Sequence, residues 1–258
     1  MASSASNSPQ AISVELVVTG ASQAVVVTAI TNSATGLTGP IAPGELISIF
    51  GTGLGPSTAT TFSANPATGM VDTTLAGTQV FFGSLAAPIL YASATQVNVI
   101  APYEIAGQSQ VAIQVQYQDG ASASQTVQVA NASPGAFTID SSGTGAVVAV
   151  NQDGTMNGAA SPAAKSSYIT IYFTGGGQTN PPGVTGSVTG TVLKWLTQPI
   201  SVTVGGELAT VSFDGAAPTL AIDQLNIRLA PNTPSGAQPI VINVGGISSP
   251  SSVTLSVQ

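Results

Sequence analysis

The sequence predicts an all-β fold of two tandem immunoglobulin-like β-sandwich domains. Two observations carry this prediction. Turn residues recur at ~8–12-residue spacing with almost no helical periodicity, and one pattern of short strands occurs twice. Residues 47–55 return as residues 169–177, and residues 96–99 return as residues 224–227. A repeat of this length indicates two similar β-domains in one chain.

The first domain is expected over residues 25–133, behind an N-terminal extension, residues 1–24, that holds an extra strand. Its clearest element covers residues 111–118, where Val, Ile, Val and Tyr alternate with Ala and Gln. This period of two is typical of a strand with one buried and one solvated face. The other strands of this domain are expected at residues 24–30, 46–50, 78–82, 88–91, 96–100 and 126–130.

The second domain is expected over residues 134–258, after a link rich in Ser, Pro and Gly. The chain has no cysteine, so the cysteine pair of antibody domains is absent and disulfides are excluded. The strands of the second domain are expected at residues 146–150, 168–173, 200–204, 210–213, 224–229, 240–244 and 253–257.

Several motifs support a closer comparison, because they follow one another in a characteristic order. They lie at residues 41–52, 87–92, 96–99, 174–183 and 204–206. Together they resemble tandem IPT/TIG-like immunoglobulin-like domains and, more narrowly, the uncharacterised C-terminal domain family of Solibacter-type acidobacterial surface proteins. The resemblance implies the sandwich fold, a place in secreted proteins and no catalytic residues. IPT/TIG domains occur in receptors, DNA-binding factors and starch-active enzymes, so the resemblance leaves the function open.

Charged side chains are unusually sparse. The chain has three Lys and Arg against ten Asp and Glu, a net charge of −7. Nucleic-acid binding needs Lys and Arg to displace counterions from phosphates, so we expect no nucleic-acid partner. No apolar run approaches the ~20 residues of a membrane helix, so we expect no membrane insertion. With few ion pairs to titrate, stability should vary little with pH.

The uncharged polar surface that this composition requires is common in secreted bacterial β-proteins and rarer in cytosolic enzymes. We therefore expect an extracellular or cell-surface location. Residues 1–10 lack the charged start and the apolar core of a signal peptide. The expected form is a mature chain that was restarted at Met1 for expression.

The side chains that most enzymes use are missing or scattered. There is no histidine and no cysteine, which excludes His-based triads and imidazole or thiolate metal sites. The acidic residues form no paired motif of the kind that glycoside hydrolysis needs. Glu45, for example, lies at a predicted turn, where solvated acids are normal. The sequence predicts a protein that is not an enzyme, with no catalytic residues and no cofactor.

One loop keeps a calcium site open as an alternative. Asn151, Asp153 and Asn157 alternate in a segment that contains a glycine, as oxygen ligands do in calcium loops. The segment has one carboxylate and no bidentate Glu at the proper distance. A hairpin turn is therefore the preferred interpretation of these residues.

Trp195, the only tryptophan, is a candidate ligand or interface residue. It lies in an apparent insertion between the repeated strands. An exposed tryptophan stacks on sugars or anchors an interface, whereas a buried one would seal the end of a sandwich, which is the commoner case. Tyr172 lies within a repeated strand, which predicts a place in the core.

Three functional interpretations follow. The preferred one is a non-catalytic secreted or cell-surface module with a structural or adhesive role and protein partners. The second is a subunit of an extracellular filament, in which a spare apolar strand with Ile12, Val14 and Leu16 pairs with a sheet edge of another copy. The third is a carbohydrate-binding module, in which Trp195 and a tyrosine such as Tyr91 or Tyr172 stack on polysaccharide.

Overall fold

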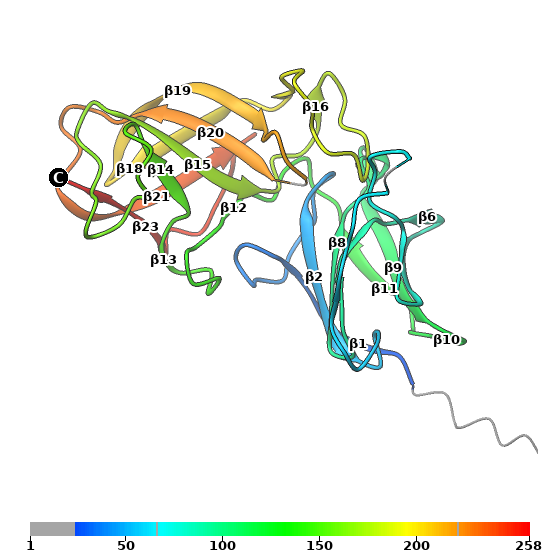
Figure 1. Ribbon diagram of the computed structural model, residues 1–258. Coiled ribbons are helices and arrows are strands. Elements are labelled where there is room, and N and C mark those ends of the chain that lie inside the picture. The colour runs from blue at the N-terminus through cyan, green and yellow to red at the C-terminus, as the bar shows by residue number, and fades with distance from the viewer. Residues whose placement is uncertain (1–23, 66, 221) are drawn as a thin grey trace, which may run out of the picture.

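The predicted fold class is confirmed: the chain is almost entirely β-structure. The computed structural model describes residues 24–65, 67–220 and 222–258. In these ranges the strands form several sheets, and one short 3-10 helix covers Tyr103–Ile105. Two separate hydrophobic cores lie inside the sheets, one built from residues 25–129 and one from residues 132–257. We call the parts around them the first and the second unit (Figure 1).

The first unit is a sandwich of two sheets around its core. Side chains of both sheets face inward, and Ile47, Ile49, Val97 and Val99 are fully buried. The strands of one sheet, in spatial order, are β1 (Val26–Asn32), β2 (Leu46–Thr52), β8 (Gln96–Ile100), β7 (Ile89–Ala92) and β3 (Thr60–Thr61). Those of the other are β10 (Gly120–Ala121), β9 (Gln110–Tyr117), β5 (Thr78–Phe82) and β4 (Thr74–Leu75), with β11 (Gln125–Gln128) on β9 and β6 (Leu85–Ala86) on β5.

The second unit folds one continuous run of strands over its core. Its long strand β19 (Glu207–Ala216) pairs with β20 (Asp223–Arg228) through one part and with β18 (Ile200–Val204) through the other. Strands that pass from one layer to the next make the corners of such sandwiches. The run is β12 (Gly135–Ala136), β15 (Tyr168–Thr174), β20, β19, β18, β21 (Gly236–Val244), β23 (Val253–Val257) and β13 (Gly145–Ala146). Short strands attach to it: β14 (Ala149–Asn151), β16 (Thr179–Asn180), β17 (Trp195–Leu196) and β22 (Ile247–Ser248).

The repeated motifs occupy equivalent places in the two units. In the first unit β2 pairs with β8, and Ile47 lies opposite Val99. In the second unit β15 pairs with β20, and Ile169 lies opposite Ile227. All of these side chains are buried. The same residues of the motif thus meet in the same register, which is the arrangement that a copied unit would give.

Tyr103 helps to lock the two units together. Its ring lies against Gly44 of the first unit and Gly183 of the second, so closely that a Cβ on either glycine would fall within 2.5 Å of ring carbons. The backbone carbonyl of Tyr103 accepts a hydrogen bond from Gln178 Nε2 at 2.7 Å, and its amide donates to Thr185 Oγ1 at 2.9 Å. A small apolar cluster across the junction adds Val71, Leu90, Ile100 and Leu220.

Two carboxyl groups are buried at this junction, against the expectation of solvated acids at turns. Glu45 is fully buried and accepts a hydrogen bond from the Ala42 amide at 2.6 Å. Burial raises its pKa to about 8, with a further contribution from Asp223. Burial likewise raises the pKa of Asp223 to about 7, although its carboxylate accepts the Gly176 amide at 2.8 Å. The two raised pKa values go against the expectation that stability varies little with pH, because each group holds a proton in the folded chain at pH values where the unfolded chain has lost it.

Candidate functional site

The candidate site lies on the outer face of the second unit's sheet and begins at β15. Ile169, Ile171 and Phe173 of this strand are buried, so the residues between them point outward. Tyr172 is one of these and is only partly buried. The expectation that Tyr172 belongs to the core is wrong, because it has the opposite phase to the core residues of its own strand.

Amide side chains continue this outer face on β20. Gln224 lies opposite Tyr172, and Asn226 lies opposite Thr170. Gln224 Nε2 donates to Asn226 Oδ1 at 3.0 Å, and Thr170 Oγ1 donates to the same oxygen at 3.0 Å. The two amides are thus held in place while Gln224 Oε1 and Asn226 Nδ2 have no hydrogen bond to a described residue.

A bulge in β19 adds the next part of the face. The register between β19 and β20 shifts between Val211 and Phe213. Such a bulge re-aims side chains, and here it lets both Ser212 and Phe213 line the same cavity. Ser212 Oγ donates to the backbone carbonyl of Asn226 at 2.9 Å, which ties the bulge to β20.

Trp195 closes the face from β17, and a glycine makes its position possible. Trp195 pairs with Gly215 of β19, and a Cβ at Gly215 would lie 1.9 Å from the carbonyl oxygen of Lys194. Any other residue would push β17 away. The Trp195 ring packs edge-on against Phe213, with 4.8 Å between ring centroids and 64° between ring planes. Trp195 nevertheless stays 42% exposed, so it does not seal the sandwich.

These side chains surround a cavity of about 420 Å³, which we call the Trp195 cavity. Its apolar wall is completed by Val192 and Leu193, which are mostly exposed. Its polar wall holds Ser212, Gln224 and Asn226 and the threonines of the loop before β17. None of the lining residues is charged. The lining residues are Thr189, Gly190, Thr191, Val192, Leu193, Trp195, Ser212, Phe213, Ala216, Pro218, Gln224 and Asn226.

A second cavity, of about 550 Å³, adjoins the first and is called here the Tyr172 cavity. Phe137, Ile139 and Tyr172 form its apolar wall, and Thr138, Ser141 and Thr219 also line it. Pro218 lines both cavities. No charged residue lines the second cavity either.

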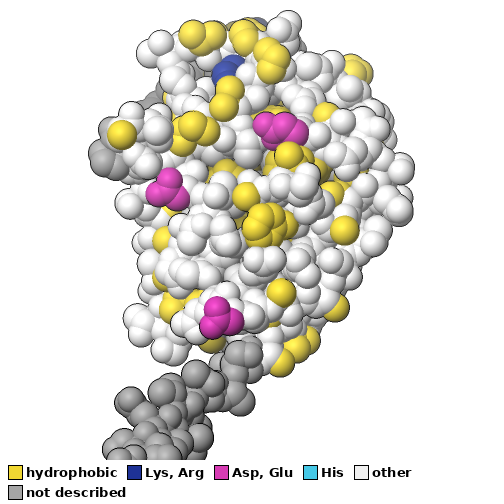
Figure 2. Space-filling model, turned by 90° about the vertical axis from the view of Figure 1, so that its right-hand side faces the viewer, with side chains coloured by type: hydrophobic (Ala, Val, Ile, Leu, Met, Phe, Trp, Pro, Cys, Tyr) yellow, Lys and Arg dark blue, Asp and Glu magenta, His cyan; other side chains and the backbone are white. Residues whose placement is uncertain are grey.

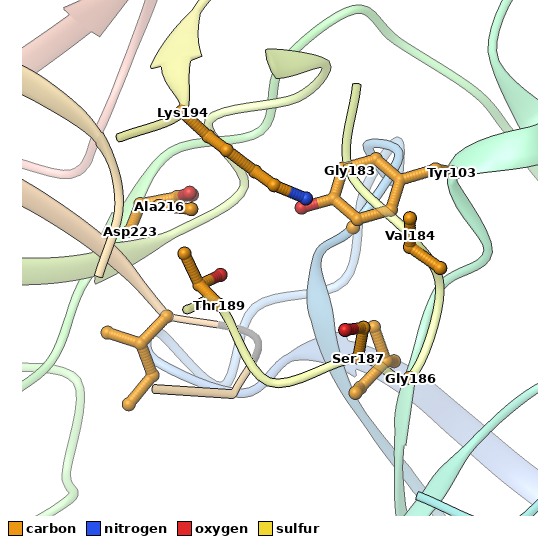
Figure 3. Close-up of a pocket in the computed structure, with 12 residues that line it drawn as sticks. Tyr103, Gly183, Val184, Gly186, Ser187, Thr189, Lys194, Ala216 and Asp223 are labelled. Atoms are coloured by element: carbon orange, nitrogen blue, oxygen red, sulfur yellow. The ribbon is translucent and has the colours of Figure 1, made fainter. Parts of the chain in front are cut away.

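The hollow between the two units is much smaller than these cavities. It has a volume of about 20 Å³, roughly the space that one water needs. Tyr103 and Val184 line it from one side, and Lys194 and Asp223 from the other (Figure 3). It is too small for an organic ligand, so we place the binding function on the outer face of the second unit.

The structure places the calcium candidates in a hairpin turn after β14. Asn157 Oδ1 accepts the Ser256 amide at 2.9 Å, and Asn151 Oδ1 accepts Asn157 Nδ2 at 3.0 Å. Asp153 Oδ1 accepts both the amide and the hydroxyl of Thr155. These oxygens serve the turn itself, which favours the hairpin interpretation over a calcium loop.

The other predicted contact residues, Ile12, Val14 and Leu16, lie outside the described residues. Phe213, Gln224 and Asn226 were missed as site residues, although residues 224–227 were recognised as a repeated motif. The sequence did contain a signal for Gln224 and Asn226. The two amides alternate with the apolar residues of their strand, and this alternation indicates that they lie on its outward face.

Charged side chains are few and scattered over the face of the molecule seen in Figure 2, where hydrophobic side chains stand out mostly singly. Across residues 24–258, leaving aside 66 and 221, the structure has no helix that is long and apolar enough to cross a membrane.

Comparison with solved structures gives remote similarities. The extracellular region of plexin A4 is 12% identical with a TM-score of 0.31, over 98% of this chain and 20% of that one. SGBP-B from a Bacteroides ovatus mixed-linkage glucan utilization locus, in complex with a mixed-linkage heptasaccharide, is 15% identical with a TM-score of 0.32. The match covers 85% of this chain and 43% of that one. SGBP-B from a complex xyloglucan utilization locus in Bacteroides uniformis is 13% identical with a TM-score of 0.26. The match covers 88% of this chain and 48% of that one.

The chain thus spans from a fifth to about half of the length of these structures. At such identities and TM-scores they say nothing about what this chain binds. None of the curated proteins matches the chain. The narrower Solibacter-type assignment stays a prediction. The family model of the IPT/TIG domain matches residues 26–130, and these residues therefore form an IPT/TIG domain, which is an immunoglobulin-like fold.

Proposed function

We propose that this chain is a non-catalytic adhesion module of an extracellular surface, and that its second unit binds neutral carbohydrate in the Trp195 cavity. The observation that carries the proposal is the composition of that cavity: a half-exposed tryptophan faces two oriented amides, and no charged residue lines it. Binding sites of this kind are concave and mostly apolar, with a few polar groups that fix the orientation of the ligand.

The two walls of the cavity match the two kinds of surface on a sugar ring. A pyranose has an apolar face of C–H groups and a rim of hydroxyls. The Trp195 ring, held edge-on by Phe213, offers a flat surface for the apolar face. Gln224 Oε1 can accept from a hydroxyl and Asn226 Nδ2 can donate to one. Because each amide is already anchored, little side-chain entropy is lost on binding.

The two basic side chains near the cavity are engaged elsewhere, which favours a ligand without negative charge. Lys194 precedes Trp195, yet its Nζ donates to the carbonyl of Pro182 at 3.1 Å. Arg228 lies on the same strand as Gln224, and its guanidinium carbon is 5.9 Å from the centroid of the Tyr168 ring. Neither cation lines the cavity. An acidic sugar would find no counter-charge there, whereas a neutral sugar needs none.

The extracellular location is supported by composition. With a net charge of −7 and three basic residues, the surface is covered by hydroxyl and amide side chains. Such a surface suits contact with polysaccharide better than contact with nucleic acid or anionic lipid.

The test is retention on immobilised polysaccharides by affinity electrophoresis. The panel holds mixed-linkage β-glucan, xyloglucan, starch and galactomannan as neutral probes and polygalacturonate as the acidic one. We expect at least one neutral probe to retard the protein and polygalacturonate to have no effect. Trp195→Ala should abolish the retardation. Phe62→Ala is the matched control, because Phe62 is an equally exposed aromatic, at 39%, on the other unit.

Two outcomes would contradict the proposal. One is a protein that no neutral polysaccharide retards. The other is retardation that Trp195→Ala and Phe62→Ala change to the same extent, since binding would then not pass through the Trp195 cavity.

A further inference from the structure

We infer that the carbohydrate is an extended chain of several sugar units, which crosses the sheet from Trp195 to Tyr172 and fills both cavities. The inference rests on the proposed function and deepens it, because it fixes the class of ligand as a polysaccharide chain rather than a single sugar. It also assigns a binding role to Tyr172.

The pairing of the strands places the two aromatic residues in one row across the sheet. Tyr172 of β15 lies opposite Gln224 of β20. Gln224 lies opposite Gly215 of β19, and Gly215 lies opposite Trp195 of β17. The row therefore covers three spacings between neighbouring strands, or roughly 14 Å at ~4.8 Å each. A monosaccharide is far shorter than this separation, whereas a chain of several units can reach both rings.

The surface between the two rings is suited to the same ligand. Gln224 lines the Trp195 cavity and is the cross-strand neighbour of Tyr172, so its strand position lies on the row, one strand spacing from Tyr172 and two from Trp195. Gly215 presents no side chain that would stand up between the rings. Pro218 borders both cavities, which makes them neighbouring parts of one surface. A polymer of identical units can stack at both ends of this row and form a hydrogen bond with the Gln224 amide between them.

Both cavities along this row are lined by uncharged residues. Neither cavity has a charged lining residue, and the hydroxyl-bearing residues Thr138, Ser141 and Thr219 are among those that line the Tyr172 cavity. An apolar peptide could fill the Tyr172 cavity, but it would not use the anchored amides beside Trp195. A neutral sugar chain uses the aromatic rings, the amides and the hydroxyls together.

The experiment is a calorimetric titration with oligosaccharides cut from the polysaccharide that the protein retains, from the disaccharide to the octasaccharide. We expect affinity to rise with length until the chain covers both cavities. Tyr172→Ala should lower the affinity for the octasaccharide about tenfold, which corresponds to the loss of one aromatic contact. It should change the affinity for the disaccharide less than about twofold, because the disaccharide needs the Trp195 cavity alone.

Tyr168→Ala is the matched control, since Tyr168 lies on the outer face of the same strand, is 47% exposed and lines neither cavity. It should leave both affinities unchanged. Two results would overturn this inference and leave the proposed function standing. One is an affinity that does not depend on the length of the oligosaccharide. The other is an octasaccharide affinity of Tyr172→Ala that equals that of Tyr168→Ala. If no polysaccharide is retained at all, both fail. Binding of a synthetic peptide of residues 10–20 at Tyr172, without any effect of Tyr172→Ala on the octasaccharide, would assign that cavity to self-association instead.

Discussion

Acidification should stabilise this protein, because the two buried carboxyl groups at the junction fold in their neutral form. The perturbation is a change of pH from 8.5 to 4.5, compared between the native chain and Glu45→Gln. The pKa of Glu45 is raised from 4.5 to about 8, and that of Asp223 from 3.8 to about 7. Between those values each group binds a proton in the folded state that the unfolded chain has already lost.

The sign and size follow from proton linkage. Stability falls as pH rises wherever the folded state binds more protons, by somewhat more than ~1 kcal/mol per pH unit for each group. The contribution is fully present below the unfolded pKa and is lost as pH passes the folded pKa. Over roughly three pH units this amounts to several kcal/mol per group, on the order of half of a typical domain's stability.

The assay is urea unfolding at a series of pH values. The free energy of unfolding should be highest near pH 4.5 and should fall steadily towards pH 8.5. Glu45→Gln keeps an oxygen for the Ala42 amide and cannot ionise. Its Nε2 can donate to the Ser133 hydroxyl, which in the native chain lies 3.5 Å from Glu45 Oε1. The variant should therefore match the native chain at low pH and exceed it by roughly 2 kcal/mol or more above pH 8. A flat native profile, a loss of stability on acidification, or a variant whose profile runs parallel to the native one would refute the reasoning.

Four further predictions concern the site, the junction and the alternatives. Gly215→Ala should move β17, since its Cβ would meet the Lys194 carbonyl oxygen; we expect polysaccharide binding to fall at least tenfold while the far-ultraviolet circular dichroism stays native. Ile171→Ala, which removes a fully buried side chain, should cost about 2–5 kcal/mol in urea unfolding, whereas Thr170→Ala on the outer face should cost about 1 kcal/mol or less. Gly183→Ala places a Cβ 2.3 Å from the Tyr103 ring and should loosen the junction, seen as a larger radius of gyration in small-angle scattering, with little change in sugar affinity. Millimolar calcium should leave the melting temperature unchanged, since the oxygens of Asn151 and Asn157 already accept hydrogen bonds; a clear rise would restore the calcium interpretation.

The all-β fold and much of the strand arrangement could be predicted from local pattern. Period-two alternation identifies β9, and the repeated motif identifies β2 with β15 and β8 with β20. The same alternation contains the correct assignment of Tyr172, because Ile171 and Phe173 on either side of it are buried. The core prediction for Tyr172 failed because membership of a strand was considered without its phase.

The site and the junction depend on contacts between distant residues, which local pattern does not contain. Trp195 is exposed beside Phe213 because Gly215, twenty residues later, lets β17 approach β19. The bulge between Val211 and Phe213 follows from pairing with β20. Glu45 reads as a turn residue in sequence, yet it is fully buried, and the distant Ser133 lies 3.5 Å from its carboxylate through Oγ.

The most direct test of the central claim is the fluorescence of Trp195 during titration with a neutral polysaccharide. Trp195 is the only tryptophan in the chain, so any change in its emission reports on this cavity alone. If carbohydrate binds there, the emission should shift to shorter wavelength and saturate with added mixed-linkage β-glucan, xyloglucan, starch or galactomannan, and polygalacturonate should leave it unchanged. An emission spectrum that none of the neutral polysaccharides alters would contradict carbohydrate binding at Trp195.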